Sequence, residues 1–401
     1  NDAIIYTTAN PGPLPDPPNS PSSQIQTTIN NAIGFANYDI GHAVGGSGGG
    51  GAVTPLGNVC GTQKAQGFTA LNPPRGDIFD IDFVAHELGH QLGGSHTWFG
   101  CGGGGQWTQT SAMEPGSGTT IMAYAGICPD NLAPNSDAYF HARSFTQIFQ
   151  VMENGGAGNG NTVCGTVTAT GNTPPNIAAP SNLTIPKQTP FQLTAVGSDA
   201  NAADILSYNW EQVDTGTPSA PPSTTGANGT APLFRSFNAS LSPTRIFPSL
   251  PYILNNANVP PTNISLPPAA GSFFPAEILP NPASGTRLMN FRITARDNAV
   301  NGGGLRHAEM QVTATSSAGP FSVGNIGTAL TGGATQAVTW TVANTDVAPV
   351  STSLVNILFS QDGGYSFSTL LANAPNNGAA SVTIPNVTTN GGRIRVEAAI
   401  G

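Results

Sequence analysis

The segment HELGHQLGGSH, residues 86–96, is the most informative part of this chain. It holds three of the six histidines in a sequence of 401 residues. Residues four positions apart lie on one face of a helix, so His86 and His90 can direct ring nitrogens at the same point. Gly93 lets the chain leave the helix through a left-handed turn, after which His96 can return as a third ligand. The spacing therefore predicts a metal site with three histidine ligands.

Three protein ligands leave a coordination position open for water, which is typical of catalytic zinc rather than structural zinc. Glu87 follows the first ligand and can act as the general base that takes a proton from the zinc-activated water. We therefore expect zinc-dependent hydrolysis of an acyl bond, with a peptide bond as the expected substrate. The alternative is a buried helix whose histidines merely pack, and five fixed residues at this spacing argue against it.

The composition indicates a turn-rich protein with several domains. The chain has 50 Gly, 35 Pro and only 8% charged residues, which is typical of short strands joined by many loops, and its length predicts two or three domains. Its formal net charge is −9 and its 12 Lys and Arg residues are scattered, which argues against a nucleic-acid partner. No stretch of the sequence is long and apolar enough to predict a membrane span.

The cysteines indicate the compartment. All four fall within the first 164 residues and none forms a CxxC pair, so we expect two disulfides rather than structural zinc. Disulfides and the scarcity of lysine favour a secreted, extracellular protein. The alternative is four reduced thiols in a cytoplasmic protein.

Helical periodicity is confined to the first part of the chain. The apolar spacing predicts one helix over 77–92, which carries the histidine motif, and a second over 142–154. Farther along, short alternating runs separated by Gly, Pro and Asn predict β-sandwiches. We therefore expect three units: a metallopeptidase domain over 1–165, a β-sandwich over 174–316 with a long insertion at 215–285, and a second β-sandwich module over 319–401.

A second motif follows the histidines. The pattern H-E-x-x-H-x-x-G-x-x-H followed by a methionine turn defines the metzincin metalloproteases, and this sequence resembles them. In GSGTTIMAYAGIC, residues 116–128, Met122 matches the turn methionine and Met113 is the competing candidate. Through NYDIGHAV, GGGGAVTPLGNVC and the two motif regions, the chain is most similar to the bacterial reprolysin-like group over roughly residues 30–165. The resemblance implies an α/β catalytic domain with a mixed twisted sheet and a zinc-binding active-site helix, followed here by two all-β immunoglobulin-like sandwiches.

The resemblance implies further site residues. Tyr124 matches a tyrosine of astacin-type and serralysin-type members that ligates zinc or donates to the oxyanion, and a core tyrosine is the alternative. In metzincins an edge strand pairs with the substrate peptide, and the stretch after the methionine lines the main pocket. The residues implied here are Gly51, Ala52, Val53, Ala125, Gly126 and Ile127. One departure is Thr97, where reprolysins carry Asp after the third histidine.

The resemblance also bears on the cysteines and on the beginning of the chain. Four cysteines permit three connectivities. A Cys60–Cys164 pair resembles the long bridge of reprolysins, and Cys101 with Cys128 completes that assignment. Reprolysins have a strand and a long helix ahead of the segment that DAIIYT resembles. We therefore expect either a cleaved N-terminal propeptide or upstream fragment as a partner, or a longer sequence.

The later part of the chain resembles sandwiches of the polycystic-kidney-disease (PKD) and cadherin-like types, through SYNWEQV and FRITARDN. Turns of such relatives often bind calcium through carboxylates, which makes Asp199, Asp204 and Asp297 candidate Ca²⁺ ligands. The acidic turn is diluted here to SDANAAD.

The leading interpretation is a secreted zinc endopeptidase that acts on protein or peptide substrates. The alternative from another class is an adhesion or matrix-binding protein whose protease-like domain is catalytically weak. A metal-dependent amidase that acts on something other than protein is a third. The intact histidine and glutamate set in residues 86–96 favours the first.

Overall fold

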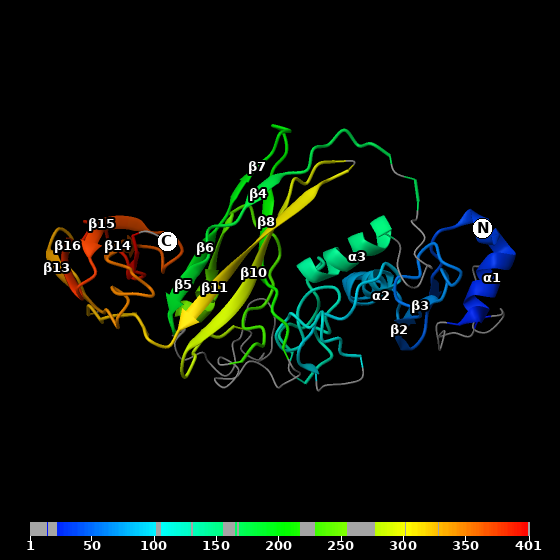
Figure 1. The fold of residues 1–401 in the computed structure, drawn as a ribbon, viewed down its shortest axis with the longest axis horizontal. Coiled ribbons are helices and arrows are strands. Elements are labelled where there is room, and N and C mark those ends of the chain that lie inside the picture. The colour runs from blue at the N-terminus through cyan, green and yellow to red at the C-terminus, as the bar shows by residue number, and fades with distance from the viewer. Residues whose placement is uncertain are drawn as a thin grey trace.

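The computed structural model shows several units that follow one another along the chain (Figure 1). It describes residues 14, 22–101, 106–129, 131–154, 165–166, 168–216, 229–254, 277–300, 302–327 and 329–399. Helices and a small sheet form the N-terminal unit, and two β-rich units come after it. This confirms the predicted α/β domain followed by two all-β sandwiches. Within the described ranges, no helix has the length and apolar character needed to cross a membrane.

The N-terminal domain is built on a small mixed sheet. Its first elements are α1 (Ser23–Ile33), η2 (Phe35–Asn37), β1 (Ala43–Gly45), β2 (Gly49–Val53) and β3 (Gly67–Leu71). β1 pairs parallel with β3, and β2 pairs antiparallel with the other side of β3. The buried side chains that join α1 to the sheet are Ile25, Ile29, Ala43, Ala65 and Phe68. β2 therefore lies at an edge of this three-stranded sheet.

The histidine motif lies on a helix with two kinds of turn. The predicted helix over 77–92 forms, but its first part, η3 (Ile78–Ala85), is π-helical, and α2 (His86–Gln91) continues it. Gly93 follows with φ of 102°, the left-handed conformation predicted for the exit from the helix. The second predicted helix forms as α3 (Ala142–Asn154). A side chain at Gly93 would collide with α3, so both conformation and packing require glycine there.

The first sandwich combines a four-stranded sheet with two strand pairs. Its strands are β4 (Asn176–Ala178), β5 (Leu183–Pro186), β6 (Phe191–Thr194), β7 (Val196–Ser198), β8 (Ser207–Gln212), β9 (Thr244–Phe247), β10 (Thr286–Arg296) and β11 (Leu305–Thr315). The sheet order is β5-β11-β10-β8, while β4 pairs with β7 and β6 with β9. Trp210, Phe247 and Phe291, from three of these strands, are buried in one core.

Part of the segment 215–285, expected as an insertion, packs into this core. Its described residues supply β9, the short helix α4 (Leu250–Leu254) and the buried side chains of Leu233 and Phe234. The rings of Phe234 and Phe247 pack edge to face with centroids 5.1 Å apart. The first sandwich is therefore completed by a segment whose Pro-, Ser- and Asn-rich sequence shows no strand periodicity.

The second sandwich has two three-stranded sheets. Its strands are β12 (Ser322–Val323), β13 (Thr335–Thr341), β14 (Leu354–Ser360), β15 (Ser368–Pro375), β16 (Ala379–Thr383) and β17 (Arg393–Ala398). The sheet orders are β12-β13-β16 and β15-β14-β17. Side chains from both sheets, including Trp340, Ile357 and Val382, form one buried core.

The N-terminal domain and the first sandwich share a buried interface. All residues of β8 are buried, and Glu211 on this strand accepts the backbone N–H of Ala142 at 3.1 Å. Arg292 of β10 donates to the Ala142 carbonyl at 3.2 Å and to Oγ1 of Thr146 at 2.8 Å. Figure 1 shows α3 beside this sheet. The first sandwich therefore packs directly against the helix that carries Ala142 and Thr146.

Candidate metal centre

Three histidine side chains converge beside α2. His86 and His90 project from α2, and His96 follows the turn at Gly93. The Nε2 atom of His96 lies 3.2 Å from Nε2 of His86 and 3.1 Å from Nε2 of His90. The three side chains therefore form a group that could hold a metal ion.

Each ring is oriented by a hydrogen bond from its other nitrogen to a backbone carbonyl. The pairs are His86 Nδ1 with Ile121 O (2.6 Å), His90 Nδ1 with Gly94 O (2.7 Å) and His96 Nδ1 with Gln106 O (2.8 Å). A carbonyl oxygen only accepts, so Nδ1 carries the proton of each neutral ring. The Nε2 lone pairs of the three rings therefore face one another.

The electrostatics of this histidine cluster suit a metal cation. Burial, followed by the nearby charge of His96, lowers the pKa of His86 to about 3. Burial also lowers the pKa values of His90 and His96, so all three rings are neutral at pH 7. A tetrahedral zinc ion with Zn–N distances of about 2.0–2.1 Å would place its nitrogen ligands about 3.3 Å apart. The residues present therefore fit zinc.

Glu87 lies next to the histidine cluster and close to the edge strand. Its side chain is buried, burial raises its pKa to about 8, and its Oε2 atom has no hydrogen-bond partner among the described residues. A Cβ atom at Gly51 would lie 2.5 Å from Oε1 of Glu87. The backbone of β2 thus approaches Glu87 so closely that a side chain at position 51 would displace the Glu87 carboxylate. Ala52 and Val53, the next two residues of β2, are half-buried.

Met122 packs against the helix that carries the histidines. It is completely buried, and a side chain at Gly89 on α2 would collide with its Sδ atom. Its carbonyl accepts the N–H of Thr97 at 3.0 Å. Met113, the competing candidate, is half-buried and donates its N–H to the Thr97 carbonyl at 3.0 Å. Both methionines thus flank Thr97, and Met122 also contacts α2.

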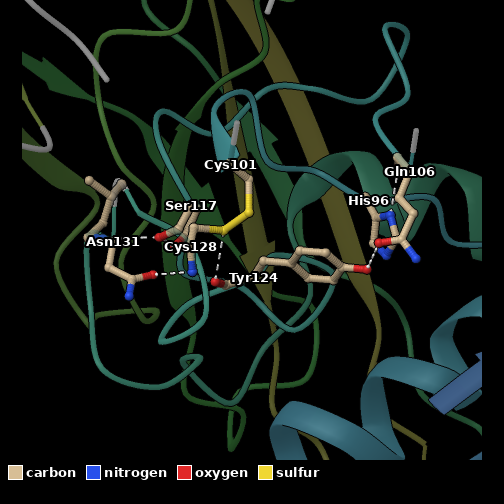
Figure 2. Close-up of a disulfide and its surroundings, with 9 residues drawn as sticks. His96, Cys101, Gln106, Ser117, Tyr124, Cys128 and Asn131 are labelled. Carbon is tan, nitrogen blue, oxygen red and sulfur yellow. Dashed lines mark hydrogen bonds between the residues drawn. A yellow bond between two sulfur atoms is a disulfide. The ribbon is translucent and has the colours of Figure 1, made fainter. Parts of the chain in front are cut away.

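Tyr124 stands at the side of the histidine cluster, and its hydroxyl points toward Gln106 (Figure 2). Its ring centroid is 4.5 Å from that of His96 and 5.6 Å from that of His86. The hydroxyl donates to Oε1 of Gln106 at 2.6 Å. Burial, and then the charge of Glu87, raises the pKa of Tyr124. Tyr124 is therefore a protonated hydrogen-bond donor beside the cluster.

The other predicted pocket residues follow Tyr124 directly. Ala125 is buried, whereas Ile127 is 68% exposed. Gly126 has φ of 87°, and a side chain there would collide with the Pro134 carbonyl. Their part in substrate binding stays a prediction.

A disulfide ties the segment after the histidine motif to the turn that carries Tyr124. Cys101 and Cys128 are bonded, with Cα atoms 4.9 Å apart, which confirms this predicted pair. Sγ of Cys128 lies 3.3 Å from the Tyr124 carbonyl oxygen (Figure 2). Cys60 is also disulfide-bonded, and its predicted partner, Cys164, lies outside the described residues.

Two residues near the histidine cluster escape sequence-based prediction. Glu114 is 1% exposed and accepts the Thr97 hydroxyl. Gln106 accepts hydrogen bonds from both His96 and Tyr124. Their partners lie 10 to 18 positions away, so no helical or strand spacing marks either residue.

A second group of metal-ligating side chains lies in the first sandwich. Carboxylate oxygens of Asp199, Asp204 and Asp297 lie within 4.8 Å of one another. Asp297 is completely buried, and the Oδ2 atoms of Asp199 and Asp204 are buried without hydrogen-bond partners among the described residues. The structure thus brings together the three residues predicted as calcium ligands.

Comparison with family models finds a match over the first part of the chain. Residues 1–151 match the family model described as Metallo-peptidase family M12B Reprolysin-like, so this domain is reprolysin-like, as the resemblance implied. A comparison with curated proteins finds no match.

The similarities to solved structures are weak. The chain is similar to the FN1–FN3 domains of chicken CNTN1, with 10% identity, a TM-score of 0.18 and coverage of 56% of this chain and 58% of that one. It is also similar to SGBP-B of the Bacteroides ovatus mixed-linkage glucan utilization locus, in complex with a mixed-linkage heptasaccharide. There the identity is 13%, the TM-score 0.16 and the coverage 57% and 45%. The chain thus spans about half the length of these two structures.

Proposed function

We propose that this protein is a secreted zinc-dependent endopeptidase that hydrolyses peptide bonds. The observation that carries the proposal is the convergence of three neutral imidazoles, whose Nε2 atoms are 3.1–3.2 Å apart in the two pairs that His96 makes. The buried carboxylate of Glu87 and the reprolysin-like match of residues 1–151 support the same chemistry. The Cys101–Cys128 disulfide supports an extracellular location.

The residues of the site have complementary roles in this proposal. Zinc held by His86, His90 and His96 would supply Lewis acidity and lower the pKa of water toward 7. Glu87 would accept a proton from the attacking water at Oε2 and return it to the leaving amine, and a pKa close to neutral suits both steps. The Tyr124 hydroxyl would donate a hydrogen bond to the developing oxyanion.

The proposed substrate is an extended peptide that pairs with β2. An edge strand offers backbone N–H and C=O groups to such a peptide, which gives binding with little dependence on sequence. Because Gly51 lies against Glu87, a peptide paired with β2 would pass close to the general base. Ala125 to Ile127 would line the pocket for one substrate side chain.

Metal removal and reconstitution test this function. The purified protein should contain stoichiometric zinc by mass spectrometry and should cleave casein. Treatment with o-phenanthroline should abolish cleavage, and added zinc should restore it. Folded protein that binds zinc but cleaves no protein substrate would favour the adhesion alternative. Folded protein without affinity for zinc would contradict the metal site itself.

We also propose a divalent cation site in the first sandwich, with calcium as the expected ion. The supporting observation is that buried oxygens of Asp199 and Asp204, and Oδ1 of Asn172, have no hydrogen-bond partner among the described residues. Asn172 lies in the same group, because its Nδ2 donates to Asp297 at 2.6 Å. Oxygen ligands of this kind suit calcium.

The cation site is tested by thermal unfolding. Calcium should raise the unfolding temperature of the wild-type protein, and Asp204→Asn should remove most of that increase. Asp346→Asn, at an exposed position in the second sandwich, is the control and should keep it. An equal response of all three proteins would exclude Asp204 as a ligand.

A further inference from the structure

We propose that Glu114 is a positioning residue that holds the third histidine of the metal centre against the methionine turn. The inference rests on the proposed function and concerns the same site. Glu114 is 1% exposed, and its backbone pairs with Trp98, two residues beyond His96. Its contacts connect the segment that follows His96 to the segment that precedes Met122, and they fix the position of one relative to the other.

Both carboxylate oxygens of Glu114 are engaged. Oε1 accepts the hydroxyl of Thr97 at 2.6 Å and that of Thr120. Oε2 accepts the backbone N–H groups of Thr119 at 2.8 Å and Thr120 at 3.2 Å. Hydrogen bonds to a buried carboxylate are charge-assisted and stronger than neutral ones. This Glu114 junction therefore joins the segment after the third histidine to the segment that leads into the methionine turn.

The main chain makes the same connection. Thr97 donates its N–H to the Met122 carbonyl at 3.0 Å, and its own carbonyl accepts the Glu114 N–H at 2.9 Å. Phe99 donates its N–H to the Glu114 carbonyl at 2.8 Å. Thr97 is therefore held through both its backbone and its side chain. Because His96 is the preceding residue, a shift at Thr97 would move its ring as well.

The Glu114 junction accounts for the departure at Thr97 from the reprolysin pattern. Reprolysins carry Asp after the third histidine, and this chain has threonine there. A carboxylate nevertheless reaches the Thr97 side chain, because Glu114 approaches it from 17 positions farther along the chain. The negative charge is therefore present next to the third histidine, although another segment supplies it.

Zinc affinity should depend on the Glu114 junction. Some residues orient a metal ligand without binding the metal themselves, and their replacement typically weakens metal affinity 10–100-fold. Thr97→Val removes the hydroxyl and keeps the shape, so we expect it to weaken zinc binding about 10-fold or more. Thr97→Ser keeps the hydroxyl, so its affinity should stay within about threefold of the wild-type value. Glu114→Gln should weaken binding too, because an amide can present only one acceptor oxygen to four donors.

The experiment measures zinc dissociation constants of the metal-free full-length proteins by competition with a fluorescent chelator. The unfolding temperature of each metal-free sample is recorded alongside. Thr69→Val is the matched control, since Thr69 is completely buried like Thr97 and its hydroxyl lies 2.9 Å from Nε2 of His42. This control should lose stability to a similar extent and keep the zinc affinity of the wild type.

The outcomes separate the inference from the proposed function. Weaker binding in Thr97→Val, with recovery in Thr97→Ser and no loss in Thr69→Val, supports the role of Glu114. Equal affinities of the wild type and Thr97→Val, or an equal loss in Thr69→Val, would overturn this inference alone. A folded wild-type protein that binds no zinc would overturn the proposed function and this inference with it.

Discussion

Nε2 of His141 in the N-terminal domain lies 3.7 Å from Oε1 of Glu211 in the first sandwich, and both side chains are completely buried. Nδ1 of His141 accepts the N–H of Arg143 at 3.0 Å, which leaves Nε2 on the side of the Glu211 carboxylate. Glu211 also accepts the Ala142 N–H at 3.1 Å and the Ser236 hydroxyl at 3.2 Å. The first sandwich thus supplies a buried carboxylate to the start of α3.

Glu211→Ala should destabilise the N-terminal domain and the first sandwich together. The substitution leaves the Ala142 N–H and the Ser236 hydroxyl without their acceptor in a buried interface, which costs about 3 kcal/mol. Chemical denaturation followed by circular dichroism measures this loss. Glu309→Ala, at the 56% exposed partner of Arg292, should cost about 1 kcal/mol or less. Equal stability of both variants would show that the interface contributes little.

Glu87→Gln should retain zinc and lose turnover. The amide fills the same space but cannot accept the proton of the attacking water, and loss of a general base typically lowers kcat about 10²–10⁴-fold. Cleavage of a fluorogenic peptide, with the zinc content measured on the same sample, checks this. Glu153→Gln makes the same change at an exposed position of α3 and should leave kcat unaltered. Normal turnover in Glu87→Gln would assign the proton transfer to another group.

Gly51→Ala should impair catalysis, whereas Gly49→Ala should be tolerated. A methyl group at 51 would overlap Glu87, while at 49 its nearest neighbour would be Cδ1 of Leu71 at 3.8 Å, an ordinary contact. We expect a loss in kcat/KM of about 10-fold or more for the first variant, as a displacement of about 1 Å in a catalytic group can cost 10²-fold. Similar activities of the two variants would contradict the close approach of β2 to Glu87.

Acid should destabilise the metal-free protein. The pKa values of His86, His90 and His96 are lowered by burial, so their contribution to stability is present above about pH 6.5 and is lost as the pH falls below it. The pKa of Glu87 is raised to about 8, so its effect has the opposite pH dependence. Its contribution to stability is present below about pH 4.5 and is lost as the pH rises toward 8. Between pH 5 and 6.5, the three histidines together change the free energy of unfolding more than the single glutamate does.

The free energy of unfolding of the chelator-treated protein should therefore decrease from pH 7 to pH 5, on the order of 1 kcal/mol per pH unit. Urea titrations at several pH values measure it. His86→Gln should reduce this pH dependence because it removes one of the buried rings. A stability that increases toward pH 5 would show that the rings are protonated in the folded protein.

Removal of the Cys101–Cys128 bond should lower both stability and activity. The bond spans 27 positions, for which the chain-entropy model gives about 3–4 kcal/mol. It also holds the turn that carries Tyr124. The double variant Cys101→Ser with Cys128→Ser should therefore unfold at a lower temperature and cleave peptide more slowly. An unchanged unfolding temperature would show that the surrounding hydrogen bonds suffice.

Local spacing made much of this protein predictable, because helices bring together residues a few positions apart. The histidine cluster, the left-handed Gly93 and α3 all follow from such spacing. Contacts between segments that are far apart in the sequence do not follow from local spacing. Glu114 and Glu211 act through partners 17 and 69 positions away, and no periodic pattern encodes those pairings.

The burial of part of the segment 215–285 in the core could not be predicted from its sequence either. Its composition is typical of a surface loop, and its apolar residues are irregularly spaced. Leu233 and Phe234 nevertheless lie inside the first sandwich. Their burial depends on the strands around them, which come from both sides of the segment in sequence.

The run of glycines at the start of β2 has a consequence for selectivity. A strand without side chains at 49, 50 and 51 has nothing with which to exclude a bulky peptide, so, in the proposed pairing with β2, discrimination among substrates would fall to residues outside this strand. The three positions nevertheless differ in the room around them, because a Cβ is accommodated at Gly49 and collides with Glu87 at Gly51. Larger residues introduced at 49 are therefore the natural starting point for engineering a narrower cleavage repertoire.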